Sequence, residues 1–118
     1  MPFGISGTAG LTFNDSTTQS TAAPLPIGTT WTNMTASRTM GVTYTNTTGK
    51  YIQVIVGGST YGSGGGFNLT INGVTLPPIF AYSGAVGTNS PCALVPPGAT
   101  YSATTYGEAS YGSWYELR

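Results

Sequence analysis

The chain has 118 residues, three basic and three acidic side chains, no histidine and a formal net charge of zero. Three scattered cations cannot neutralise a row of phosphates, so the composition predicts no nucleic-acid binding. No run of about 18 apolar residues is present, so we also expect no membrane insertion.

The balance of residue types favours an all-β fold. Thr, Tyr, Val, Ile and Gly are frequent, and these residues favour strands and turns. The straight-chain residues that stabilise helices are scarce. A free monomer usually keeps many charges on its surface for solubility. A chain with six charged side chains is therefore expected to form a homo-oligomer.

The N-terminal quarter carries weak signals. Residues 1–13 mix glycine with isolated apolar residues and fit short extended segments. Residues 14–30 are polar and then rich in proline, which is typical of a loop or linker. The first clear strand signal begins at Trp31.

The next two segments are expected to form an antiparallel hairpin. Residues 38–46 alternate apolar residues with threonine, the pattern of a strand with one apolar face. Residues 46–49 are a turn signal. Residues 50–56 are the most apolar stretch, and we expect a central strand buried on both faces.

Residues 57–66 are rich in glycine and surround a single aromatic residue, Tyr61. A phosphate-binding loop of this kind would need a following Lys-Ser or Lys-Thr pair and a helix, and neither is present. The sequence therefore predicts a flexible, exposed loop.

A second hairpin has the clearest local signal in the chain. Apolar residues alternate on both sides of the pair Asn72-Gly73. Such a pair favours a two-residue turn because both positions need positive φ angles. The register then places Ile71 opposite Val74 and Leu69 opposite Leu76, with all four on one face.

The remaining sequence predicts short strands separated by loops. The expected strands cover residues 79–82, 92–95, 100–106 and 114–117, and the expected loops cover 83–91 and 107–113. Seven to eight short strands with regular turn signals suggest an antiparallel β-sandwich or a small barrel, and we favour the sandwich.

The sequence offers few groups for catalysis or metal binding. Without histidine, no Ser-His-Asp or Cys-His arrangement can form, and a lone cysteine cannot build a zinc site or an intrachain disulfide. Cys92 is expected to be a small buried residue. Asp15, Glu108 and Glu116 are expected to be surface charges or simple ion pairs, with Arg38 as a structural partner of Glu116. The sequence therefore predicts no enzyme, no metal and no cofactor.

Surface recognition is the activity that the residue types favour. Tyrosine beside serine and glycine is typical of binding loops, because its ring gives contact area at a low entropy cost. Candidate receptor-binding residues of this kind are Tyr61, Tyr82, Asn89, Tyr106 and Tyr111. The alternative is that these residues pack within the domain or against a sister subunit. The strand aromatics are expected in the core or a subunit contact: Trp31, Tyr44, Tyr101 and Trp114.

Four segments together resemble the C-terminal tips of bacteriophage tail fibres. In order, they are residues 31–38 (WTNMTASR), 41–52 (GVTYTNTTGKYI), 95–101 (VPPGATY) and 114–118 (WYELR). The pattern is a Trp before an Arg, a Tyr-x-Asn-x-Thr-Gly turn, an apolar strand and a closing segment. The resemblance covers about residues 28–118.

The resemblance implies a β-sandwich at the distal end of a trimeric fibre on the virion. Such a tip would bind bacterial surface polysaccharide, lipopolysaccharide or an outer-membrane protein, with host specificity in loops 57–66, 79–92 and 104–113. Residues 1–27 would be an N-terminal extension or a linker from the upstream fibre shaft, and residues 28–118 the tip. The scaffold would comprise Trp31, Arg38, Tyr44, Pro96, Pro97 and Trp114.

Two other functions fit the sequence less well. The chain could be a structural virion part, such as a decoration or fibre-shaft piece, without its own ligand. It could also be a fragment of a polysaccharide depolymerase. Three scattered carboxylates disfavour that enzyme, because glycosidases usually place two carboxylates across the scissile bond.

Overall fold

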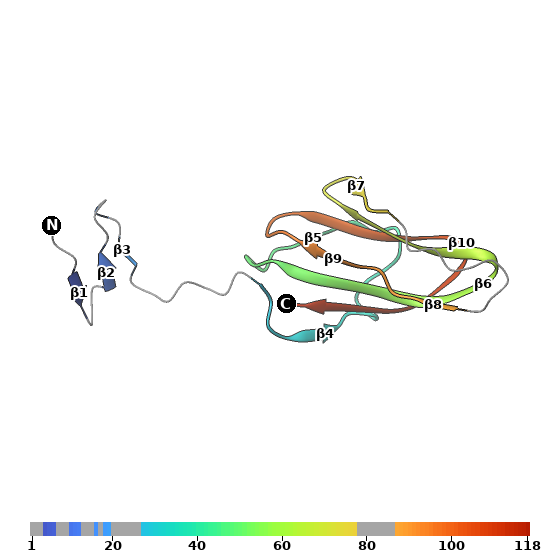
Figure 1. Ribbon diagram of the computed structural model, residues 1–118, viewed down its shortest axis with the longest axis horizontal. Coiled ribbons are helices and arrows are strands. Elements are labelled where there is room, and N and C mark those ends of the chain that lie inside the picture. Colours follow the sequence, from blue (N-terminus) through green and yellow to red (C-terminus); the bar gives the residue numbers. More distant parts are fainter. Residues whose placement is uncertain (1–3, 7–9, 13–15, 17, 20–26, 78–86) are drawn as a thin grey trace.

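A computed structural model of the chain describes residues 4–6, 10–12, 16, 18–19, 27–77 and 87–118 (Figure 1). Near the N-terminus, three short strands form an antiparallel sheet in the order β1-β2-β3: β1 (Gly4–Ser6), β2 (Gly10–Thr12) and β3 (Thr18–Gln19). The first two are the short extended segments expected within residues 1–13. The third lies inside the segment that was predicted to be a loop or linker.

The rest of the described chain forms one seven-stranded antiparallel sheet. Its strands are β4 (Trp31–Asn33), β5 (Tyr44–Thr45), β6 (Ile52–Ile71), β7 (Val74–Thr75), β8 (Gly87–Asn89), β9 (Cys92–Val95) and β10 (Thr100–Leu117). The order is β4-β10-β6-β7, with β5 also paired to β10, and β8 and β9 paired to β6. The described residues contain no helix, so the all-β, antiparallel prediction is confirmed.

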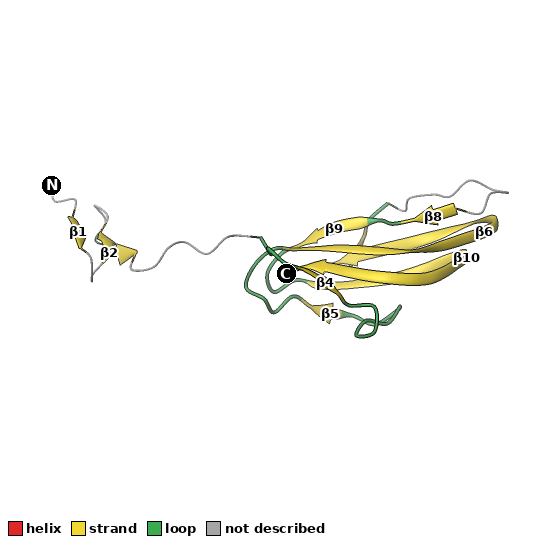
Figure 2. Cartoon of the chain, turned by 90° about the horizontal axis from the view of Figure 1, so that it is seen from below, coloured by secondary structure: helices red, strands yellow, loops and turns green. Residues whose placement is uncertain are grey.

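Two long strands make the sheet curl on itself. β6 and β10 pair along almost their full length, from Tyr101 opposite Ile71 to Leu117 opposite Gln53. The paired ribbon bends midway, so its two halves face each other, and the bend lies at the end away from the C-terminus (Figures 1 and 2). Register shifts in β10 between Gly107 and Ala109, and between Tyr111 and Ser113, are typical of strands that bend.

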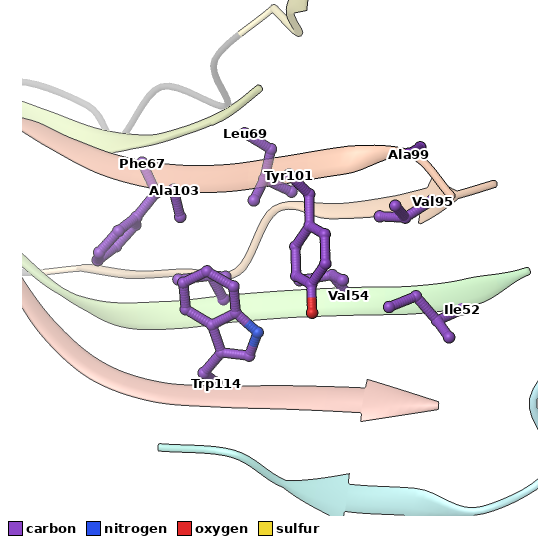
Figure 3. Close-up of a cluster of buried hydrophobic side chains, with 10 residues drawn as sticks. Ile52, Val54, Phe67, Leu69, Val95, Ala99, Tyr101, Ala103 and Trp114 are labelled. Carbon is purple, nitrogen blue, oxygen red and sulfur yellow. The ribbon is translucent and has the colours of Figure 1, made fainter. Parts of the chain in front are cut away.

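The hydrophobic core fills the space between the two halves. Alternate residues of β6 and β10 point inward, because neighbouring side chains of a strand point to opposite faces. Figure 3 shows Tyr101 reaching from one half toward Trp114 of the other, and their ring centroids are 6.3 Å apart. The buried residues are Ile52, Val54, Val56, Phe67, Leu69, Val95, Ala99, Tyr101, Ala103 and Trp114.

Gly58 shows how closely the two halves approach at the bend. A Cβ atom at this position would lie 2.8 Å from Cζ of Phe67 and would clash with the backbone oxygen of Ser110. Real Cβ atoms essentially never come this close to other heavy atoms. The position needs glycine because an aromatic ring from one half rests on the backbone of the other.

The hairpin at Asn72-Gly73 is confirmed. Both residues have positive φ angles, 49° and 79°, as a two-residue turn of this type requires. Ile71 pairs with Val74, and the amide of Leu76 donates to the carbonyl of Leu69 over 2.8 Å.

The other predicted hairpin is wrong. Residues 38–43 form turns and loops, and the short strand that follows, β5, pairs with β10 instead of β6. β6 is central, as expected, but its outward residues Gln53 and Ile55 are only half-buried, so this segment is fully buried on one face alone. Arg38, at the start of the predicted strand, contacts Glu116 of β10.

Three further segments that were predicted to be loops contain strand. Residues 57–66 lie in β6, residues 107–113 lie in β10, and residues 87–89 form β8. Glycine and serine favour loops locally, but pairing between distant segments, such as Thr60 with Ala109, overrides that preference. The expected strand at 79–82 lies outside the described residues.

Candidate recognition site

Glu116 is fully buried and is surrounded by donors. Its Oε1 atom accepts hydrogen bonds from Nε of Arg38 at 2.8 Å, the hydroxyl of Tyr101 at 2.9 Å and Nε1 of Trp114 at 3.0 Å. Its Oε2 atom accepts from Nη2 of Arg38 at 3.3 Å and forms an ion pair with Nε of Arg118 at 3.4 Å. The predicted ion pair with Arg38 is confirmed. The idea of a surface charge at Glu116 is wrong, because the core closes over it.

The buried cluster around Glu116 raises the pKa values of two neighbouring side chains, Tyr101 and Arg38. Burial, followed by the charge of Glu116, raises the pKa of Tyr101 to about 12. Burial alone would lower the pKa of Arg38, but its hydrogen bond and ion pair with Glu116 raise it above the ordinary value. The Arg38 guanidinium also lies 4.4 Å from the ring centroid of Tyr44, a favourable cation–π geometry. Both carboxylate oxygens are occupied, so the cluster acts as a clamp between the loop before β5 and the end of β10.

The predicted recognition residues have different degrees of exposure. Tyr106 and Tyr111 are half-buried in β10, and Asn89 is 5% exposed in β8. The hydroxyl of Tyr111 donates to the carbonyl of Thr35 at 3.2 Å, and burial raises its pKa. Tyr111 therefore contributes to packing, which was the alternative considered for these residues.

Two further candidates are only partly covered or not covered by the structure. For Tyr61 the backbone lies in β6, but its side chain is not among the described parts. Tyr82 lies outside the described residues. Their role in recognition stays a prediction.

The curled sheet brings these separate segments together at its bend. Gly58 pairs with both Asn89 and Tyr111, so these two residues lie on one row across β8, β6 and β10. Tyr106 pairs with Gly66 just beyond the bend. Three segments that were predicted as independent loops are thus neighbours in one sheet.

The exposed side chains near the bend lie within residues 104–113, where the resemblance implies host specificity, and among them Glu108 is exposed, as expected for a surface charge. In β10 they are Thr104, Thr105, Glu108 and Ser110. Of the two carboxyl side chains that the structure describes, Glu108 is exposed and Glu116 is buried. The groups that solvent reaches in this part of β10 are therefore hydroxyls and a single carboxylate, with Tyr106 beside them. Only the pairing of β10 with β6 reveals this surface.

A shallow cavity lies on the other half of the ribbon. Its volume is about 150 Å³. It is lined by residues of four separate segments: Thr43, Thr70, Gly73, Thr100, Tyr101 and Ser102. Sequence reasoning missed it because no local pattern connects them. Their hydroxyls can donate and accept hydrogen bonds but carry no charge at neutral pH.

The structure also settles the placement of other aromatic residues and of the cysteine. Trp114 and Tyr101 are in the core, as expected, and Tyr44 packs against it. Trp31 is 49% exposed, so a place in the core is wrong and only the alternative of a subunit contact stays. Cys92 is exposed, which contradicts the expected burial, because its position in β9 faces away from the core.

Within the described ranges, no three His, Cys, Asp or Glu side chains gather where they could hold a metal ion. The described part of the chain also has no helix that is long and apolar enough to cross a membrane. In comparisons with known proteins, the chain matches no family model, no curated protein and no solved structure.

Proposed function

We propose that the chain is a receptor-binding tip of a bacteriophage tail fibre, a homotrimer at the distal, host-facing end of the virion. It would attach to a bacterial polysaccharide, lipopolysaccharide or outer-membrane protein, and it would do so without catalysis. The observation that carries this proposal is the contrast between the two described carboxylates. Glu116 makes five polar contacts inside the fold, so the groups left for recognition near the bend are hydroxyls, the Tyr106 ring and the single exposed carboxylate of Glu108.

The fold supports a scaffold role for three of the positions that carry the resemblance, Arg38, Tyr44 and Trp114. The two facing halves of the curled sheet, with the core between them, would serve as the β-sandwich of such a tip. Arg38, Tyr44 and Trp114 meet around the buried Glu116. A rigid framework of this kind can hold a binding surface in a fixed shape.

We place the receptor surface at the bend of the ribbon. The exposed residues Thr104, Thr105, Glu108 and Ser110 lie there together with the half-buried Tyr106. Hydroxyl groups can hydrogen-bond to sugar hydroxyls, and a tyrosine ring can contact the apolar face of a sugar. Tyr61 and Tyr82 stay candidate receptor-binding residues on the sequence argument alone.

The proposal is tested by binding of the purified chain to a panel of bacterial strains. We expect binding to a restricted set of strains, and we expect the bound chain to block infection by the corresponding phage. Thr105→Arg and Ser110→Arg place a large charge at the bend and should weaken binding at least tenfold. Thr47→Arg, at an exposed position in the turn after β5, is the matched control and should bind like the wild type.

Two outcomes would contradict the proposal. If both bend variants bind a responsive strain as well as the control, the receptor surface lies elsewhere. If the folded wild type binds no strain across a broad panel, the purely structural virion component becomes the better account.

A further inference from the structure

The outer face of one half of the ribbon is unusually apolar. Val54 and Glu116 point into the core, so their neighbours along β6 and β10 point outward. The strand register then defines two rows across β4, β10, β6 and β9. The first row is Trp31, Leu117, Gln53 and Leu94, and the second is Asn33, Tyr115, Ile55 and Cys92. We refer to these two rows as the apolar face.

Large side chains of this face are open to solvent. Trp31 is 49% exposed, Leu94 is 55% exposed and Tyr115 is 40% exposed. Tyr51 lies two residues before Gln53 and forms a β-bridge with Ile27. Tyr51 is 43% exposed and Ile27 is 38% exposed, and the pair lies next to the first row. Five of the seven large hydrophobic residues that the described chain exposes thus gather on or beside one half of the sheet.

The area of the apolar face is large enough to matter. With about 200 Å² for a fully exposed large side chain, the exposed fractions of the two rows together with the adjoining Tyr51 and Ile27 leave on the order of 500 Å² of apolar surface per copy. Patches of this size on a monomer commonly mark an interaction site. Two such faces in contact would remove about 1,000 Å² from water, which reaches the lower range of specific interfaces.

We propose that the apolar face is where one copy of the chain packs against another copy. The two rows contain no Asp, Glu, Lys or Arg, so two identical faces meet without charge repulsion. Gln53 and Asn33 supply amide groups that can pair across the contact. A charged partner would find no complementary charge on these rows, whereas the uncharged surface of a sister copy leaves no charge unpaired at the contact.

The scarcity of charge in the whole chain also favours a second copy of the chain as the partner that covers the apolar face. Six charged side chains among 118 residues give a free monomer little protection against association. Covering the apolar face with a sister copy removes the surface that would otherwise cause non-specific aggregation. This inference rests on the homotrimer part of the proposed function and locates its contact, but it does not depend on whether the bend binds a receptor.

The first test compares two substitutions at exposed aliphatic residues. Leu94→Glu introduces a charge into the apolar face, and Val74→Glu introduces the same charge into β7, where the residue is 64% exposed. We expect sedimentation at micromolar concentration to give a dimer or trimer for the wild type and for Val74→Glu. We expect Leu94→Glu to sediment as a monomer with an unchanged circular dichroism spectrum.

The second test uses the native cysteine and needs no substitution. Cys92 lies in the second row and is exposed in the single chain. In the assembled wild type we expect it to react with a maleimide at least tenfold more slowly than a free thiol, and to regain reactivity on dilution into the nanomolar range. A monomeric wild type, an assembled Leu94→Glu or a fully reactive Cys92 in the assembled protein would each overturn the proposal.

Discussion

Replacing Glu116 with glutamine tests whether the buried clamp is structural. Glutamine keeps the volume of the side chain but removes its charge and one of its two acceptor oxygens. If the new NH2 group takes the place of Oε1, it faces the donors of Arg38, Tyr101 and Trp114. If it takes the place of Oε2, it faces Nη2 of Arg38, so a donor meets a donor in either orientation. The guanidinium of Arg38 then stays in the fold without its carboxylate partner.

The size of the effect follows from burial. Removing one partner of a buried ion pair costs about 3–5 kcal/mol, because the other charge is left uncompensated. The side chain of Arg38 is only 13% exposed, while that of Arg118 is 31% exposed and can turn toward water. We therefore expect a loss of about 3 kcal/mol in the free energy of unfolding. A domain of this size has only about 5–15 kcal/mol in total.

Urea unfolding followed by tryptophan fluorescence measures this change, since Trp114 contacts the carboxylate directly. Glu108→Gln is the matched control, because it removes the same charge from an exposed position and should change the free energy by less than about 0.5 kcal/mol. The double variant Arg38→Met, Glu116→Gln should recover part of the loss, because it removes the uncompensated guanidinium while the amide oxygen of the glutamine can still accept from Tyr101 and Trp114. A value for Glu116→Gln within about 0.5 kcal/mol of the wild type would refute the reasoning.

Three further substitutions probe other parts of the fold. The pKa of Tyr101 is raised from 10.0 to about 12 in the folded state, so its contribution to stability is complete below pH 10 and is lost as the pH rises through 12. The free energy of unfolding of the wild type should fall by about 2–3 kcal/mol over that range. In Tyr101→Phe the plot of this free energy against pH should be flatter, and parallel plots for the two proteins would contradict this. Gly58→Ala should lower the free energy of unfolding by about 1–3 kcal/mol in urea, since its methyl group meets the backbone of β10 and the Phe67 ring of the facing half. An unchanged urea midpoint would contradict this close packing. Asn46→Ala should lower the melting temperature through a loss of about 2–3 kcal/mol, because the buried amide nitrogen lies within hydrogen-bond distance of three carbonyl oxygens. A melting temperature equal to that of the wild type would contradict that role.

Local sequence signals predicted the features that depend on neighbouring residues. The turn at Asn72-Gly73 depends only on the φ preferences of two residues, and it is present as expected. The strand at residues 92–95 and the start of a strand at Thr100 also follow from local pattern. The ion pair of Arg38 with Glu116 could be expected because charges are so few that each has little choice of partner.

The predictions that were wrong concern features that depend on contacts between distant segments. The glycine-rich residues 57–66 form strand because β10 pairs with them, and no local propensity reveals that partner. The role of Asn46 was missed because its side chain reaches the carbonyl groups of Val95 and Pro96, about fifty positions away along the chain. Cys92 was expected in the core because its residue type is usually buried, but the pleat of β9 turns it outward.

The composition by itself determined that the protein is built from strands and that it has few ionisable groups. β-Branched and aromatic side chains favour extended backbone wherever they occur. The lack of histidine and the small number of charged residues hold for any fold that the chain could adopt. The tertiary structure alone decided where the ribbon bends, which carboxylate is buried and which side of the sheet is left apolar. Strand pairing sets all three, because register selects which alternate residues face the core and which face outward.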